Sequence, residues 1–177
     1  MGAVFSSRFG EITFTDDQVI EVRKGIFGFA RYSKYIIMER KENFPFKWLH
    51  CIEDPNLAFV LVDPLLFFPN YRIEPEQKDL EELQVKDQEE LAIYVIVTIT
   101  SDPNLTSANL IAPLVLNLKK KKAKQIVLPR SPYTIKHYLF HQANRGIANR
   151  WKVPKPVSFS SDIIIDANWK TNRWVIF

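Results

Sequence analysis

Short apolar runs, alternating or continuous, recur along residues 1–140 and predict β-strands. The longest run, residues 91–100, is dominated by β-branched side chains, which lose rotamer freedom in a helix and favour an extended strand. We expect residues 110–118 to be its pairing partner. The other predicted strands are residues 11–14, 19–22, 35–38, 48–52, 58–62 and 124–128.

Turn residues separate these runs, as in Asp-Pro-Asn at 54–56 and 102–104 and in the Gly-x-x-Gly of residues 25–28. Eleven prolines agree with many short strands, because proline is tolerated at turns but breaks helices. Residues 78–83, extending at most to residue 90, carry a helical pattern on an otherwise charged stretch. The pattern therefore predicts an all-β sandwich or small barrel with one short surface helix.

Length and composition narrow the class of protein. A chain of 177 residues with 46% hydrophobic residues is typical of one globular domain. Cys51 has no partner for an internal disulfide, and the first residues lack a secretion signal, so we expect a cytoplasmic protein. The apolar runs are too short to span a bilayer, so no membrane association is expected.

Charge divides the chain near residue 140. Residues 1–140 hold eighteen residues of each sign, whereas residues 141–177 account for the whole net charge of +4. We therefore predict a β domain over residues 1–140 and a basic C-terminal extension over residues 141–177, here called the tail. Its role is not evident from the pattern, and its apolar end, residues 174–177, favours a sticky appendage over an added strand.

Catalytic and metal sites are poorly supported by the residues. His50, Cys51, His137 and His141 could in principle bind a metal, but adjacent residues of a strand point to opposite faces, so we expect no metal or other cofactor. The carboxylates of Asp54 and of Asp63 both precede proline, where an aspartate caps its own turn. No nucleophile or phosphate-binding motif is present, which predicts a protein that is not an enzyme.

Nucleic-acid binding is the alternative function. It would use the tail and a lysine cluster between two predicted strands, where a solvated hairpin turn is the simpler interpretation. The cluster consists of Lys119, Lys120, Lys121, Lys122 and Lys124.

One segment carries a sequence signature that is much more specific than the features above. Residues 48–71 read WLHCIEDPNLAFVLVDPLLFFPNY and resemble the signature of the bacterial flagellar assembly factor FliW family. The resemblance extends over about residues 8–140. Shorter matches follow the family in order and spacing at residues 9–12, 25–29, 98–103, 106–113, 124–128, 131–133 and 139–140.

The resemblance implies a small antiparallel β-barrel-like domain without catalytic activity. It also implies two protein partners, flagellin and the RNA-binding translational regulator CsrA. In the family, flagellin held in the cell sequesters FliW, and flagellin export frees FliW to bind CsrA and relieve repression of flagellin translation. Because CsrA is inhibited allosterically, we expect no direct contact with nucleic acid, and we expect a monomer.

Aromatic and charged residues at turns and strand ends are typical interface anchors. An acidic stretch over residues 74–90 would also suit a basic, RNA-binding partner. Because the side chains of neighbouring residues point to opposite sides of an extended chain, we expect one of Phe67 and Phe68 to lie in the core. The predicted protein-binding residues are Asp54, Phe67, Phe68, Tyr71, Glu74, Glu76, Asp79 and Asn104.

Overall fold

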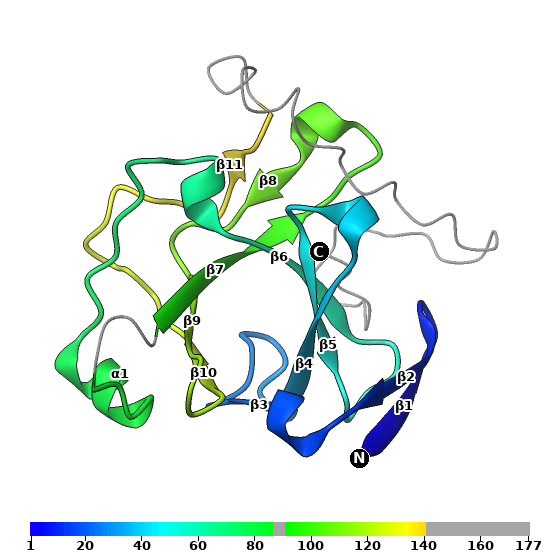
Figure 1. The fold of residues 1–177 in the computed structure, drawn as a ribbon. Coiled ribbons are helices and arrows are strands. Elements are labelled where there is room, and N and C mark those ends of the chain that lie inside the picture. The colour runs from blue at the N-terminus through cyan, green and yellow to red at the C-terminus, as the bar shows by residue number, and fades with distance from the viewer. Residues whose placement is uncertain (87–90, 141–177) are drawn as a thin grey trace.

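Seven strands close into a barrel in the computed structural model, which describes residues 1–86 and 91–140 (Figure 1). The barrel order is β3–β4–β5–β6–β7–β9–β10, and β10 returns to β3. These strands are β3 (Ile20–Val22), β4 (Lys34–Glu39), β5 (Lys47–Cys51), β6 (Ala58–Val62), β7 (Leu91–Thr98), β9 (Leu114–Asn117) and β10 (Lys122–Gln125).

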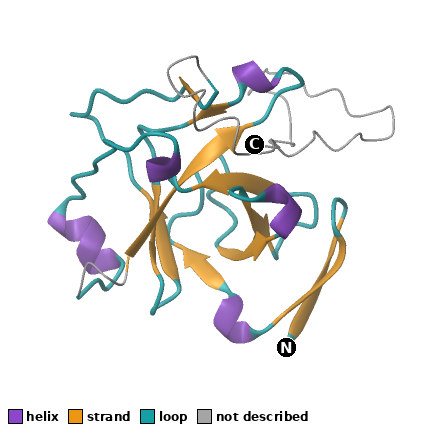
Figure 2. Ribbon diagram, turned by 45° about the horizontal axis from the view of Figure 1, so that its top comes forward, coloured by secondary structure: helices purple, strands orange, loops and turns teal. Residues whose placement is uncertain are grey.

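The barrel closes through its only parallel pair among the described strands, in which Lys122 lies opposite Glu21 and Ala123 opposite Val22. All the other described pairs are antiparallel, including β7 with β9, which was the pairing predicted for the long central run. One short α-helix, α1 (Gln77–Glu82), begins one residue before the predicted range. Figure 2 shows the helical segments around the strands. The all-β, barrel-like fold class is thus confirmed.

Of the three apolar clusters among the described residues, the two larger ones share the barrel wall, and the smallest consists of Leu83, Val115, Ile126 and Leu128. Alternate residues of β5 show this division: Leu49 and Cys51 pack inside the barrel, in the barrel core, with Phe59 and Leu114. Trp48 points outward into a second cluster, the outer core, which lies between β5–β7 and the segments that cover them. Strand β6 contributes to both clusters, and all five of its residues are buried.

Several predicted strands have slightly different bounds in the structure, such as that expected at 91–100, which ends at Thr98, and two differ more. The strand expected at 110–118 begins only at Leu114, because residues 109–112 form a turn in which the Asn109 side chain accepts a hydrogen bond from the amide of Ala112. The strand expected at 124–128 is β10 and ends at Gln125. Regular pairing stops there because Pro113, opposite Ile126, has no N–H to donate.

Three short strands were not predicted, and the predicted strand at 11–14 pairs with one of them. The hairpin of β1 (Gly2–Ser6) and β2 (Gly10–Phe14) stands beside the barrel (Figure 1). Strand β8 (Ser107–Ala108) pairs with the end of β7, and β11 (His137–Tyr138) pairs with β8; each is two residues long. Pairs this short have no pattern of their own and form because a neighbouring strand is in place.

Among the described residues, four single-turn 3₁₀ segments connect these strands: Asp16–Gln18, Lys41–Asn43, Pro64–Leu66 and Pro103–Leu105. The predicted tail, with its apolar clusters and His141, lies outside the described residues, as do the acidic residues 87–90. Within the described part of the chain, no helix has the length and apolar character needed to cross a membrane.

Candidate protein-binding groove

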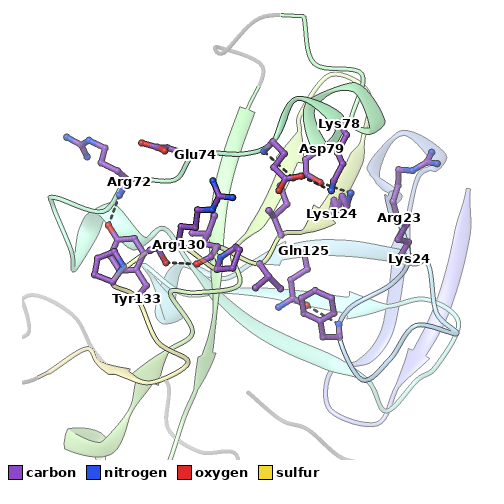
Figure 3. A pocket seen from close by; sticks show the side chains of 18 of the residues that line it. Arg23, Lys24, Arg72, Glu74, Lys78, Asp79, Lys124, Gln125, Arg130 and Tyr133 are labelled. Carbon is purple, nitrogen blue, oxygen red and sulfur yellow. Dashed lines mark hydrogen bonds and ion pairs between the residues drawn. The ribbon is translucent and has the colours of Figure 1, made fainter.

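A groove of about 630 Å³ lies beside β10, between the start of α1 and the turn that follows β3 (Figure 3). Three segments distant in sequence line it. They are residues 23–27, residues 72–79 and residues 124–133. Because each of these segments supplies only one side, the groove exists only in the folded barrel.

A buried ion pair holds the α1 wall against β10. The Nζ of Lys124 lies 2.7 Å from a carboxylate oxygen of Asp79 and 2.9 Å from one of Glu82. Although burial by itself lowers the pKa of Lys124, hydrogen bonds to both carboxylates raise it above its ordinary value. The hydrogen bond from Lys124 also lowers the pKa of Glu82. Both carboxylates therefore tie α1 to the barrel.

The opposite wall is the predicted Gly-x-x-Gly turn. Gly25 has φ of +66°, and a side chain there would come within 2.7 Å of the backbone of Ala30 and Tyr32, so only glycine fits without distortion. The amide of Phe27 donates a 2.9 Å hydrogen bond to the side-chain oxygen of Gln125. This contact leaves the Phe27 ring 55% exposed at the groove rim.

Tyr133 forms the third side of the groove, and Tyr71 supports it from behind. Their rings lie 4.7 Å apart, and the hydroxyl of Tyr71 donates to the carbonyl of Leu110 at 2.8 Å. The Tyr133 hydroxyl accepts the amide of Arg72 at 2.9 Å (Figure 3). Tyr71 is only 4% exposed, so it positions the wall rather than forming a surface.

The groove carries more positive than negative charge. Lys78 pairs with Glu76, and Lys24 lies 3.7 Å from Glu82. With these pairs set aside, three arginines remain against the exposed Glu74. The arginines are Arg23, Arg72 and Arg130.

Three of the eight predicted interface residues are buried, which corrects the expectation that they face a partner. Phe67 is 0% exposed and packs on Phe46 and Phe140 in the outer core. Asp79 is 5% exposed because it pairs with Lys124, and Tyr71 lies behind Tyr133. Phe68 is half-buried against His137. The expectation that one of the two adjacent phenylalanines is core is therefore confirmed.

The remaining predicted residues do not share one surface. Glu74 and Glu76 are exposed and line the groove. Asn104 lies in the exposed segment Pro103–Leu105, far from α1 in both ribbon views (Figures 1 and 2). Asp54 is half-buried in the β5–β6 turn, where it accepts hydrogen bonds from the Tyr32 hydroxyl at 2.5 Å and the Asn56 amide at 3.0 Å.

Turn geometry therefore accounts for the carboxylate of Asp54, as expected from the proline that follows it. Asp63 likewise accepts a hydrogen bond from the amide of Leu65, at the start of a single helical turn. Burial lowers the pKa of His50 and raises that of Cys51 to about 11. Within residues 1–86 and 91–140, no group of three or more His, Cys, Asp or Glu side chains is arranged to hold a metal ion.

The lysine cluster is divided by the fold. Lys119, Lys120 and Lys121 are exposed in the turn between β9 and β10, as predicted for a solvated hairpin, whereas Lys124 is buried in its ion pair. The sequence did not point to Phe27, Val127 or Arg130 as groove residues. An alternation of buried Ile126 and Leu128 with exposed Val127 is visible in the chain, but nothing local indicates what Val127 faces.

Comparisons of this chain with protein families, curated proteins and solved structures all find the same family. The family model described as FliW protein matches residues 3–139. Curated relatives named flagellar assembly factor FliW include those of Thermosipho africanus and Geobacter sulfurreducens. The first is 39% identical, covering 76% of this chain and 94% of the relative, and the second 38%, covering 82% and 91%. A crystal structure of the flagellar assembly factor FliW is 33% identical, with a TM-score of 0.74 over 78% of this chain and 96% of the other.

Proposed function

The chain belongs to the FliW family of flagellar assembly factors, and on this premise we propose that it binds flagellin and CsrA in competition. Flagellin would hold the protein until export removes flagellin. The freed protein would then bind CsrA, which would release the flagellin messenger for translation. The family match across residues 3–139 is the observation that carries the proposal.

Charge supports a protein partner over nucleic acid for the β domain. Residues 1–140 carry equal numbers of acidic and basic residues, so no strong positive field favours phosphate backbones. Glu74 and Glu76 are exposed beside α1 and would complement a basic RNA-binding protein. We propose these two residues, with the partly or fully exposed Asp54, Phe68 and Asn104, as partner contacts.

The proposed role requires no catalysis. Asp54 and Asp63 accept hydrogen bonds from turn amides, which supports a structural role for both carboxylates. Competition between partners needs only overlapping or coupled binding sites. We further propose that the protein works as a cytoplasmic monomer without a cofactor.

Competition binding is the direct test. Purified protein is immobilised, saturated with flagellin monomer from the same organism, and challenged with increasing CsrA, and the order is then reversed. We expect each partner to displace the other. Binding of neither partner, or simultaneous binding with unchanged affinities, would contradict the switch.

A charge reversal tests the contribution of Glu74, one of the two exposed glutamates proposed as partner contacts. Glu74→Lys should weaken CsrA binding by about tenfold, because a rim charge then repels a basic partner. Glu42→Lys is the matched control, since Glu42 is exposed in the Lys41–Asn43 turn and does not line the groove. Equal effects of the two variants on CsrA affinity would remove Glu74 from the interface.

A further inference from the structure

A segment of extended backbone lies open along the groove. After β10 the amides of Ile126 and Leu128 donate to the carbonyls of Pro113 and Ile111, which is the alternation of an antiparallel ladder. The N–H and C=O of Val127 must then point to the opposite side. Neither group has a hydrogen-bond partner among the described residues.

The edge is open because β3 leaves it. The last hydrogen bond of the parallel pair runs from the amide of Arg23 to the carbonyl of Ala123. Lys24 and Gly25 then adopt positive φ values of 63° and 66° and turn the chain away. Beyond this point the amide of Phe27 binds the side chain of Gln125 instead of the β10 backbone. No strand therefore pairs with Val127 on the side where β3 would have continued.

Side chains around this position define what could fill it. Val127 is 49% exposed and Phe27 55% exposed, and both line the groove, so an apolar side chain would find two contacts. Arg23 and Arg130 line the same groove, and the side chain of Arg130 makes no ion pair or hydrogen bond with a described residue. An acidic side chain next to the apolar one would therefore be favoured.

We propose that the groove binds an extended segment of a protein partner as an added β-strand beside Val127, and that this segment alternates apolar and acidic residues. Backbone hydrogen bonds to Val127 would supply affinity, and the pockets beside Phe27 and Arg130 would supply selectivity. The inference rests on the proposed function only in taking the occupant to be a protein.

The tail is a poor candidate for the occupant. Residues 141–177 hold six basic residues against Asp162 and Asp166, so the tail has the wrong charge for a groove with an excess of arginine. A second copy of the chain is the other alternative. Its groove-dependent self-association in sedimentation would overturn the proposal.

A blocked peptide of alternating valine and glutamate tests the mode of binding. We expect the Val127 amide to exchange with solvent at least about tenfold more slowly when the peptide is bound, as measured by NMR on the full chain. Two further peptides are methylated on alternate backbone nitrogens, one at the odd and one at the even positions. One of them should no longer bind and the other should bind as before, because only every second N–H faces the edge. Equal binding of both methylated peptides would overturn strand addition.

Charge variants test the selectivity. Arg130→Glu should weaken binding of the peptide by about tenfold, and Lys41→Glu, exposed outside the groove, should not change it. Equally tight binding of a valine–lysine peptide would overturn the acidic preference. Loss of peptide binding with retained flagellin and CsrA competition defeats this inference alone, whereas peptide binding without either partner defeats the proposed function alone.

Discussion

Three aspartates that precede proline illustrate how single residues determine the loops. Asp54, Asp63 and Asp102 each accept a hydrogen bond from the amide two residues later, at 2.9 to 3.0 Å. Each carboxylate satisfies a donor that the turn would otherwise leave to water, and proline presets the next φ. These turns are local in origin, so the sequence was sufficient to predict them.

Gly25 provides a test at the same scale. Gly25→Ala should lower the free energy of unfolding by at least about 2 kcal/mol, because it combines a positive φ with a backbone clash. Gly28→Ala, in the same turn with φ of +85° and open space, should cost only about 1 kcal/mol. Urea unfolding measures both, and equal losses would contradict the clash.

His50 predicts a pH dependence of stability. Burial lowers the pKa of its imidazole below the ordinary 6.5, so the unfolded chain takes up a proton more readily than the folded one. Its contribution to stability is therefore complete above pH 6.5 and is lost as the pH falls below that value. Denaturant unfolding between pH 7.5 and 5 should show a smaller loss for His50→Gln than for the unaltered protein.

His137 requires a control in that experiment, because burial lowers its pKa as well. His137→Gln alone should retain the part of the pH dependence that belongs to His50. Identical pH profiles for the unaltered protein and His50→Gln would show that His50 does not titrate differently in the two states.

At the scale of elements, α1 is too short to be stable alone. Six residues fall well below the length at which isolated helices persist in water. A reciprocal capping arrangement between Glu76 and Asp79 begins the helix, and Lys124 anchors it from β10. The charged helical pattern predicted the element, but the barrel stabilises it.

Removing that anchor should loosen the groove wall. Lys124→Met should cost on the order of 3 kcal/mol, because Asp79 would remain buried without its counter-charge. Hydrogen exchange of residues 77–82 should accelerate more than that of β5. Lys122→Met, in the same strand and without an ion pair among the described residues, is the control. Comparable effects from both substitutions would argue against the anchoring role.

At the scale of the whole molecule, the packing of the last described residues supports the proposed extent of the β domain. Leu139 and Phe140 are buried in the outer core, and β11 pairs with β8 just before them. The proposed domain over residues 1–140 therefore includes every buried apolar group that the structure describes. Strands such as β6 are buried on both faces, which explains their continuous apolar sequence.

Two truncations test this boundary. A chain ending at residue 140 should unfold within about 3 °C of the full chain, because it retains all the buried groups among the described residues. A chain ending at residue 136 should lose more than about 10 °C, since Leu139 and Phe140 leave cavities in the outer core. Thermal unfolding followed by circular dichroism measures both. A large loss in the first chain would contradict the domain boundary.

Local interactions determined what the sequence alone could predict. The strands predicted at 58–62 and 91–100, the lysine turn between β9 and β10, and the helix predicted at 78–83 follow from side-chain preferences within a few residues, and the structure has them within two residues of those bounds. The family resemblance was equally readable, because it lies in the order of local motifs.

Tertiary structure alone decided the groove and the environment of single side chains. Three residues do not stand out from their neighbours in the sequence: Lys124 in a run of lysines, Phe67 beside Phe68, and Val127 between two apolar residues. In the structure Lys124 is in an ion pair, Phe67 is in the core and Val127 lies at an open strand edge. Each outcome depends on residues outside the local segment, such as Asp79, Phe140 and Pro113. Those contacts form only when the barrel closes, so no local pattern encodes them.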